Sequence, residues 1–279
     1  DLNSFAKANF SQFMKKILIT GGAGYIGSHT AVELWNAGME PIILDDLSNT
    51  NEDVLDRLKE ITGKQFVFYK GDCNDKSLLE KICAAHQIEG VIHFAAFKAV
   101  GESTQFPLKY YQNNVGSLLV LLQVMKENGI HDLVFSSSCT VYGQPDVLPV
   151  TEATPRKDAE SPYGNTKKIC EDILVDYVKS KPGIRVIALR YFNPVGAHPS
   201  SKIGELPIGT PQNLVPFITQ TAAGIREKLT VFGNDYENSD GSCVRDYIHV
   251  VDVADAHVKS LSYLNEQADN FYDVFNVGT

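Results

Sequence analysis

Short apolar runs alternate with amphipathic segments along the first two thirds of the chain. Runs typical of buried strands occupy residues 16–20, 41–44, 65–69, 90–96, 133–135 and 185–189. Helical periodicity falls between them, over residues 28–37, 51–62, 75–86, 108–128 and 169–179. Strands that alternate with helices in this way predict an α/β fold with a doubly wound parallel sheet of the Rossmann type.

The pattern changes after Arg190, where Gly, Pro and Ser become frequent up to residue 211. Later segments predict helices at 213–226 and 253–264 and short strands at 229–232 and 245–250. We therefore expect a nucleotide-binding domain over residues 14–192 and a smaller substrate domain over residues 193–279. The chain either stays in that second domain or crosses back to the first near Tyr247. Residues 1–13 are expected to be an N-terminal extension.

A glycine-rich loop joins the first predicted strand to the first predicted helix. It reads Gly21-Gly22-Ala23-Gly24-Tyr25-Ile26-Gly27. Glycines at this spacing allow a tight turn and a close approach of a pyrophosphate, which the helix N-terminus then meets with free N–H groups. The loop by itself is a weak signal, but its place between a strand and a helix favours a dinucleotide site.

An acidic pair, Asp45 and Asp46, ends the second predicted strand. An acid about 20 residues after the glycine loop is placed to accept hydrogen bonds from the adenosine ribose hydroxyls. Its charge would repel a 2′-phosphate, and no Arg lies within the next ten residues. The cofactor is therefore predicted to be NAD rather than NADP.

Other polar residues lie near the predicted carboxyl edge of the sheet. Asp72 follows the third strand and either reaches the adenine or forms a turn. His93 lies in an apolar run and is interpreted as a core histidine. Asn113 and Asn114 interrupt the apolar face of the long predicted helix and need hydrogen-bond partners.

The candidate chemistry lies between residues 136 and 167. Tyr163 and Lys167 are four residues apart at the start of a predicted helix, so their side chains share one face. A nearby ammonium is expected to lower the pKa of a phenol, and a phenolate can take a proton from a hydroxyl and return it. Ser138, at a strand end, can hold the same substrate oxygen. One Tyr-x-x-x-Lys match is expected by chance in a chain of this composition, so the glycine loop and the acidic pair carry much of the argument.

Composition and charge exclude several classes of function. The net charge is −9 and no basic block is present, which argues against nucleic acid or an anionic membrane as partner. The five cysteines show no zinc spacing and no Cys-x-x-Cys pair, so we expect no metal and a reducing, cytosolic location. No apolar run is long enough to cross a membrane.

Several longer stretches resemble the extended short-chain dehydrogenase/reductase family, and most closely its members that epimerise UDP-sugars at C4. The resemblance covers residues 16–279. It is carried by residues 20–30, 98–103, 190–199, 232–236 and 244–250. It implies that the protein interconverts UDP-galactose and UDP-glucose in galactose metabolism, with tightly bound NAD and no net redox change. Members of the family are commonly homodimers, which implies pairing through the helices near 108–128 and 163–179.

The resemblance also implies roles for individual residues. Tyr163 would be the acid/base, Lys167 would tune it and bind the nicotinamide ribose, and Ser138 would bind the sugar 4-hydroxyl. The residues implied to line NAD are Gly21, Gly24, Tyr25, Ile26, Gly27, Asp45, Asp46, Asp72, Cys73, Phe94, Ala95, Lys98, Asn113, Tyr163, Lys167 and Tyr191. Those implied to hold the UDP-sugar are Ser138, Asn193, Asn213, Leu214, Thr230, Phe232 and Arg245.

The residue types support some of these roles and leave alternatives for others. The guanidinium of Arg245 matches a phosphate, although a salt bridge with Asp246 or Asp240 is the alternative. Phe232 is either a binding residue or core, and Asn193 is either a binding residue or a turn before Pro194. The family's sequences continue past Thr279, so the substrate domain is expected to be C-terminally truncated here.

Two other functions fit the same fold. A nucleotide-sugar 4,6-dehydratase needs a carboxylic acid and a carboxylate after the Ser, where this chain has Cys139 and Thr140. An NAD-binding scaffold or sensor without catalysis is the other alternative, because a fold alone does not prove activity. The presence of Ser138, Tyr163 and Lys167 together favours the epimerase.

Overall fold

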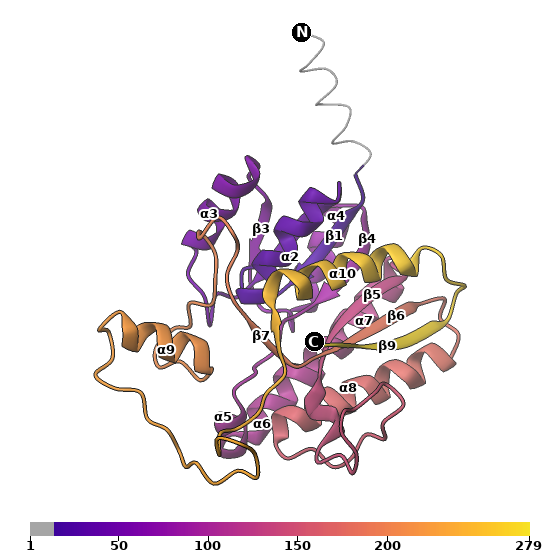
Figure 1. The fold of residues 1–279 in the computed structure, drawn as a ribbon. Coiled ribbons are helices and arrows are strands. Elements are labelled where there is room, and N and C mark those ends of the chain that lie inside the picture. Colours follow the sequence, from indigo (N-terminus) through magenta and orange to yellow (C-terminus); the bar gives the residue numbers. More distant parts are fainter. Residues whose placement is uncertain (1–13) are drawn as a thin grey trace.

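A computed structural model describes residues 14–279, and one parallel sheet forms its centre (Figure 1). The sheet has seven strands in the order β3-β2-β1-β4-β5-β6-β9, and every pairing is parallel. The strands are β1 Lys16–Thr20, β2 Glu40–Asp45, β3 Val67–Lys70, β4 Ile88–His93, β5 Asp132–Ser138, β6 Arg185–Tyr191 and β9 Phe271–Val277. The predicted doubly wound parallel sheet is confirmed. The expected extension over residues 1–13 lies outside the described residues.

Helices cover both faces of the sheet, as right-handed crossovers between parallel strands require. Helices α2 Tyr25–Asn36, α3 Asp53–Thr62 and α10 Val250–Leu264 contribute to the core on one face. Helices α4 Lys76–Ala85, α7 Gly116–Glu127 and α8 Pro162–Lys179 contribute to the core on the other. The strand order reverses direction between β1 and β4, and ligands of such sheets bind at the carboxyl edge beside that point.

The chain returns to the central sheet after the irregular segment that follows β6. Helix α10 packs against α2, and β9 pairs with β6 from Arg185↔Phe271 to Tyr191↔Val277. Strand β9 has no counterpart among the predicted strands. The return agrees with the expected crossing back near Tyr247, and the expected domain boundary at residue 193 stays a prediction.

A two-stranded parallel sheet stands at the edge of the main one, formed by β7 Asn193–Val195 and β8 Tyr247–His249. Between these strands, helix α9 Leu214–Ala222 stands apart from the body of the molecule (Figure 1). The strand expected at 229–232 is wrong, because that segment has no regular structure and its side chains Val231 and Phe232 are exposed. With no neighbouring strand, its backbone lacks a ladder partner.

The long helix expected over 108–128 is interrupted. Helix α5 Val100–Gln105 and the short α6 Pro107–Tyr110 come first, followed by a π-helical turn, η1 Tyr111–Val115, that leads into α7. The π turn carries Asn113 and Asn114. Such turns insert an extra residue into a helix and are frequent at functional sites.

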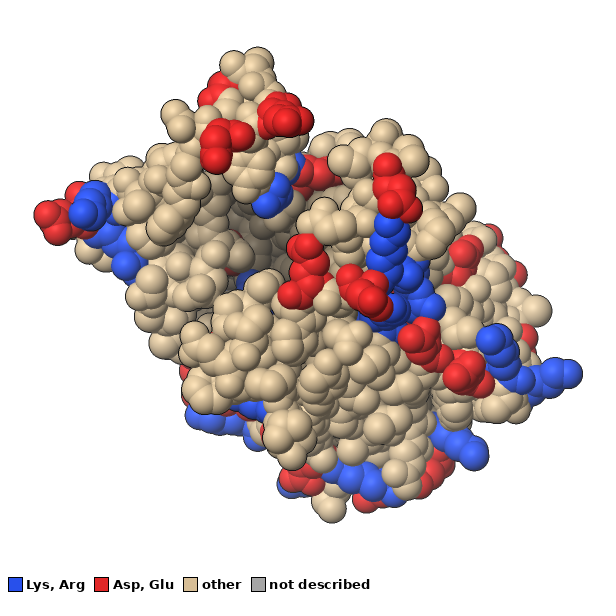
Figure 2. All heavy atoms as spheres, turned by 90° about the horizontal axis from the view of Figure 1, so that it is seen from below, with Lys and Arg blue, Asp and Glu red and all other residues tan. Residues whose placement is uncertain are grey.

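The face of the described residues that Figure 2 draws carries charges of both signs. In Figure 2, Lys and Arg side chains are interspersed with Asp and Glu on the face drawn, which is also hollowed. This agrees with the net charge of −9. Among the helices of residues 14–279, none is long and apolar enough to cross a bilayer.

Candidate active site

The glycine-rich loop lies at the carboxyl edge of the sheet between β1 and the segment after β4. Gly21 has a φ of +70°, and a Cβ there would meet the backbone nitrogen of Ala95 at 2.8 Å. A Cβ on Gly27 would collide with the Gly21 carbonyl. These two glycines are therefore required for the backbone to fold this closely, and the cradle they form suits a pyrophosphate at the N-terminus of α2.

Asp45 ends β2 and turns toward the same loop. Its Oδ2 accepts a hydrogen bond from the Ala23 amide at 3.0 Å, and its Oδ1 accepts one from the Leu47 amide at 2.8 Å. Burial raises the pKa of this carboxyl, and the two amides oppose that shift. Asp46 is exposed and accepts from the Ser48 amide at 2.9 Å. Asp45 thus orders the loop, and a carboxylate has further lone pairs for a ribose.

Aromatic side chains extend the candidate site beyond the glycine loop. Phe94 follows β4 and contacts the ring of His257 at 4.6 Å between centroids, and Tyr191 at the end of β6 contacts the same ring at 5.8 Å. The amides of Phe94 and Ala95 both donate to the Thr20 carbonyl. The expected NAD residues Gly21, Phe94, Ala95 and Tyr191 therefore share one edge of the sheet.

Two other expected NAD residues are already engaged with the protein. The Asp72 carboxylate accepts hydrogen bonds from the backbone and side-chain nitrogens of Asn74, so it forms the turn that the sequence left as an alternative. Cys73 is buried, and burial raises the pKa of its thiol to about 12. Their contacts with adenine stay predictions.

The candidate catalytic groups meet where β5 faces the start of α8. Ser138 is the last residue of β5, and Tyr163 is in the first turn of α8 after the cap Ser161 and Pro162. The Ser138 hydroxyl lies close enough to Tyr163 to favour its phenolate by hydrogen bonding. Lys167, only 4% exposed, donates to the Ser136 carbonyl at 2.6 Å and lies 4.9 Å from the Phe135 ring centroid. The serine, phenol and ammonium that the sequence singled out are therefore neighbours.

The electrostatics differ from the expectation in one respect. Burial raises the pKa of Tyr163 to about 12, whereas the sequence predicted that Lys167 would lower it. Desolvation outweighs the hydrogen bond from Ser138, and the Lys167 ammonium donates to the Ser136 carbonyl. Burial lowers the pKa of Lys167 itself to about 8, against a smaller opposing effect of Cys170 and Glu171. The protein alone holds the phenol protonated, so a further positive charge is needed at the site to favour the phenolate.

Asn114 joins α8 to the segment after β4. Its amide accepts from the Phe97 amide at 2.9 Å and donates to the Phe97 carbonyl and to the Thr166 hydroxyl, both at 3.0 Å. Asn113 beside it donates to Asn114 at 3.0 Å. The partners that the sequence required for this pair are present, and they hold the π turn against the helix that carries Tyr163.

His93 is a core residue, as predicted. It is 2% exposed, and its Nδ1 lies 2.7 Å from the Thr20 hydroxyl. Burial lowers the pKa of its imidazole to about 3, so it is neutral near neutral pH.

The residues expected to hold the UDP-sugar are spread along the edge of the second sheet and the segment around α9. Asn193 lies on β7 and donates to the Asp246 carbonyl at 2.8 Å. Asn213 precedes α9 and donates to Glu205, which also pairs with Lys98 at 3.4 Å. Thr230, Phe232 and Arg245 are exposed, and Phe232 is 92% exposed. The structure brings Asn193 to the catalytic edge of the sheet but does not bring these exposed residues into contact with Tyr163.

Two of the alternatives raised by the sequence are resolved here. Phe232 is not a core residue, because its side chain is almost fully exposed. Among residues 14–279, Arg245 makes no salt bridge with Asp246 or Asp240, and its Nη1 donates to the Val244 carbonyl at 2.8 Å. Both side chains are therefore available to a ligand.

Sequence reasoning missed two buried charges below the site, Glu171 and Arg190. Arg190 donates to both carboxylate oxygens of Glu171, from Nε at 2.9 Å and from Nη2 at 2.6 Å. A signal was present, since Glu171 is four residues after Lys167 and therefore on the same helical face.

Comparison with known proteins gives one consistent result. The model of a family described as the NAD dependent epimerase/dehydratase family matches residues 17–278. A Pasteurella multocida protein named UDP-glucose 4-epimerase is 53% identical over 263 residues, which are 94% of this chain and 77% of that protein. A Bacillus subtilis protein of the same name is 52% identical with the same coverage. A crystal structure of UDP-glucose 4-epimerase from Bifidobacterium longum with NAD+ and UDP superposes with a TM-score of 0.91 at 46% identity, covering 95% of this chain and 78% of that one.

Proposed function

The chain belongs to the NAD dependent epimerase/dehydratase family, and we propose that Ser138, Tyr163 and Lys167 carry its reaction. That reaction is the NAD-dependent interconversion of UDP-galactose and UDP-glucose. The observation that supports the residue assignment is their convergence at the carboxyl edge of the sheet, beside the glycine loop. A Rossmann sheet binds its ligands at this edge.

The residues at this edge fit NAD. The Gly21 and Gly27 cradle leaves room for a pyrophosphate, and Asp45 offers a carboxylate next to it. Bound NAD supplies a hydride acceptor and a positively charged ring beside the substrate. Lys167, buried and with a pKa of about 8, is placed to donate to a ribose hydroxyl when it is protonated.

Tyr163 would act as the acid/base. Ser138 holds the sugar 4-hydroxyl by a hydrogen bond, and Tyr163 takes its proton as C4 is oxidised. The 4-keto sugar turns over within the site, and Tyr163 returns the proton when C4 is reduced on its opposite face.

The UDP moiety would be held by the exposed residues of the second part of the chain. We assign this role to Asn193, Asn213, Leu214, Thr230, Phe232 and Arg245. The Arg245 guanidinium is free to bind a phosphate in a bidentate manner, and Phe232 offers a ring for the uracil.

The decisive experiment uses the purified full-length protein, incubated with UDP-galactose and no added NAD. Formation of UDP-glucose would demonstrate both the reaction and the retained cofactor. No turnover, with NAD released on denaturation, would contradict the residue assignment but not the cofactor site. No turnover and no NAD would favour the non-catalytic scaffold, and a 4-keto-6-deoxy product would favour the dehydratase.

We also propose that two copies of the protein assemble as a homodimer. Leu108 and Leu119, in the helical stretch 107–127, are 73% and 50% exposed, and a second copy of the chain would cover them. Sedimentation of the protein and of Leu119→Glu tests this, because a dimer should dissociate in the variant. Cytosolic location rests on the cysteine pattern alone and stays a prediction.

A further inference from the structure

Glu171 is a fully buried acid in the catalytic helix. It lies one helical turn after Lys167 and two turns after Tyr163, on the same face of α8. Its side chain is 0% exposed and accepts four hydrogen bonds. The donors are Ser137 Oγ at 2.5 Å, Arg190 Nε at 2.9 Å, Arg190 Nη2 at 2.6 Å and Arg156 Nη1 at 3.2 Å. Every lone pair that a carboxylate offers is therefore used.

The bond from Ser137 ties this acid to the strand that carries the catalytic serine. Ser137 lies between Ser136, whose carbonyl accepts from Lys167, and Ser138. Neighbouring residues of a strand point to opposite faces, so Ser137 faces α8 while Ser138 faces the substrate side. A shift of Ser137 along the strand would displace both neighbours.

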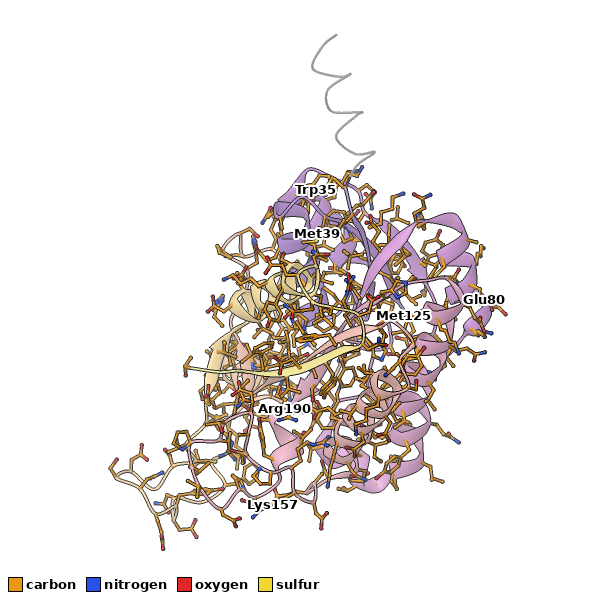
Figure 3. The ribbon with its side chains drawn as sticks, turned by 90° about the vertical axis from the view of Figure 1, so that its right-hand side faces the viewer. Trp35, Met39, Glu80, Met125, Lys157 and Arg190 are labelled. Carbon is orange, nitrogen blue, oxygen red and sulfur yellow. The ribbon has the colours of Figure 1, made fainter. Side chains whose placement is uncertain are left out.

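Arg190 extends the network to the other side of the site. It is 4% exposed on β6, and its Nη1 donates to the Tyr142 hydroxyl at 2.9 Å, which in turn donates to Asn276 on β9 at 2.6 Å. Figure 3 shows Arg190 inside the fold, whereas Lys157 lies at its lower margin. The connected elements are thus α8, β5, β6, β9 and the 3-10 turn Cys139–Tyr142.

Stability alone is a weak reason for such a network. Desolvation of two charges offsets much of their attraction, and buried ion pairs can often be replaced by apolar residues without loss of stability. What an ion pair with two parallel hydrogen bonds supplies is a fixed geometry. The geometry fixed here is the position of the catalytic helix relative to the catalytic strand.

We propose that Glu171, paired with Arg190 and bonded to Ser137, is a positioning residue that holds Tyr163 and Lys167 in register with Ser138. The inference rests on the proposed function, because it assigns a role in that same reaction. Reacting groups must be held to within a fraction of an ångström, and displacement by about 1 Å can cost about 100-fold in rate.

The network also sets the charge around Lys167. The titratable groups that act on its ammonium are Cys170 and Glu171 from α8 and His93 from β4. Of these, Glu171 is the one that favours the ammonium through a full negative charge. Loss of that charge, with Arg190 left in place, should allow Lys167 to lose its proton at lower pH.

The test measures kcat, KM and the pH profile of the full-length holoenzyme and four variants. Ser137→Ala removes the link to β5 with a small change of volume, and Glu171→Gln keeps the shape but removes the charge. Glu171→Gln/Arg190→Gln removes both charges together, so a folded protein is expected even if Glu171→Gln alone does not fold. Asp172→Asn is the matched control, because Asp172 is the next residue, is exposed, and also pairs with Arg156.

The expected result is a fall in kcat of about 10- to 100-fold for Ser137→Ala and Glu171→Gln, with KM nearly unchanged. The alkaline limb of kcat should move to lower pH by about one unit in Glu171→Gln, where Arg190 remains, and the double variant should show the same fall in kcat. Asp172→Asn should behave like the parent protein. A parent-like kcat in Ser137→Ala and in the double variant would overturn the inference. Inactivity of the parent protein would instead contradict the proposed function.

Discussion

The catalytic edge of the sheet and the segment from 205 to 246 are built in opposite ways. At the catalytic edge, Lys167, Glu171 and Arg190 each have at most 5% of their surface exposed. Each of them forms hydrogen bonds with neighbouring elements. In the later segment, Phe232 is 92% exposed and Val231 is 77% exposed. The segment's hydrogen bonds are mostly local, such as the one from the Asn238 side chain to the Ser242 carbonyl.

The difference corresponds to two tasks, proton transfer at the catalytic edge and recognition of the substrate by the later segment. Proton transfer needs groups that are fixed before the substrate arrives, and buried networks supply this. Recognition of a large nucleotide-sugar is served by side chains that gain their contacts when the ligand binds. Substitutions in the first region should therefore change kcat, and substitutions in the second should change KM. Tyr163→Phe and Phe232→Ala test this contrast directly, and two further predictions concern the stability of the buried region and the cofactor site.

The largest effect is expected for Tyr163→Phe. The variant keeps the ring but removes the proton carrier, so kcat should fall by about 10²- to 10⁴-fold. Bound NAD, measured after denaturation, should be retained, because no other expected cofactor contact is altered. Full activity in this variant would refute the assignment of the acid/base.

Acid should destabilise the buried region through its histidines. His29, His93 and His257 are at most 2% exposed, and burial lowers their pKa values to about 4, 3 and 4 from an ordinary 6.5. The unfolded chain therefore binds more protons than the folded one as pH falls below 6.5. Stability is fully present above about 6.5 and is lost as pH falls toward 4, by up to about 1.4 kcal/mol per pH unit for each histidine.

Urea unfolding of the parent protein at several pH values between 4 and 7 measures this slope. His257→Gln should unfold with a shallower dependence on pH, since one of the three groups no longer titrates. An identical slope in the variant would show that His257 does not contribute.

An intermediate effect is expected for Asp45→Ala. The variant removes the acid that would repel a 2′-phosphate, so NAD affinity should fall relative to NADP affinity by about 10-fold or more. The variant also loses the hydrogen bonds from the Ala23 and Leu47 amides, which should weaken the binding of both cofactors. Fluorescence titration with NADH and NADPH measures the ratio, and Asp46→Ala is the control for charge alone. An unchanged ratio would contradict the ribose assignment.

The smallest effect is expected for Phe232→Ala. An exposed side chain contributes within about 0.5 kcal/mol to the free energy of unfolding, so the melting temperature should barely change. KM for UDP-galactose should rise several-fold while kcat stays close to that of the parent protein, because the ring would stack on the uracil. If kcat fell instead and KM did not change, the contrast between the two regions would be wrong.

Local patterns in the sequence were sufficient for the fold class, for six of the seven strands of the central sheet and for the proposal of its catalytic residues. The glycine loop between β1 and α2 is a contiguous motif, and Tyr163 and Lys167 share a face because the helix period brings i and i+4 together. Asp45 was found by its distance along the chain from that loop. The family relationship was also carried by contiguous stretches.

Other features could not be read from local patterns. The segment 229–232 has the composition of a strand but has no partner strand, because strand formation depends on pairing and not on propensity alone. The π turn at 111–115 occurs where Asn114 must bond to Phe97 and Thr166 at once. Lys167 shares a helical face with Tyr163, but its ammonium goes to a carbonyl of β5.

The sequence by itself determined the parallel sheet and the use of NAD, and it was enough to propose the loop that binds NAD and the reacting groups, since each depends on residues close together in the chain. Only the tertiary structure decided what surrounds those groups. Glu171 and Arg190 pair across 19 residues of sequence, and Tyr142 reaches Asn276 across 134. Whether a charge is buried and which partner it meets depends on how helices and strands pack. Local spacing does not encode that packing, which sets both the geometry and the pKa values at the site.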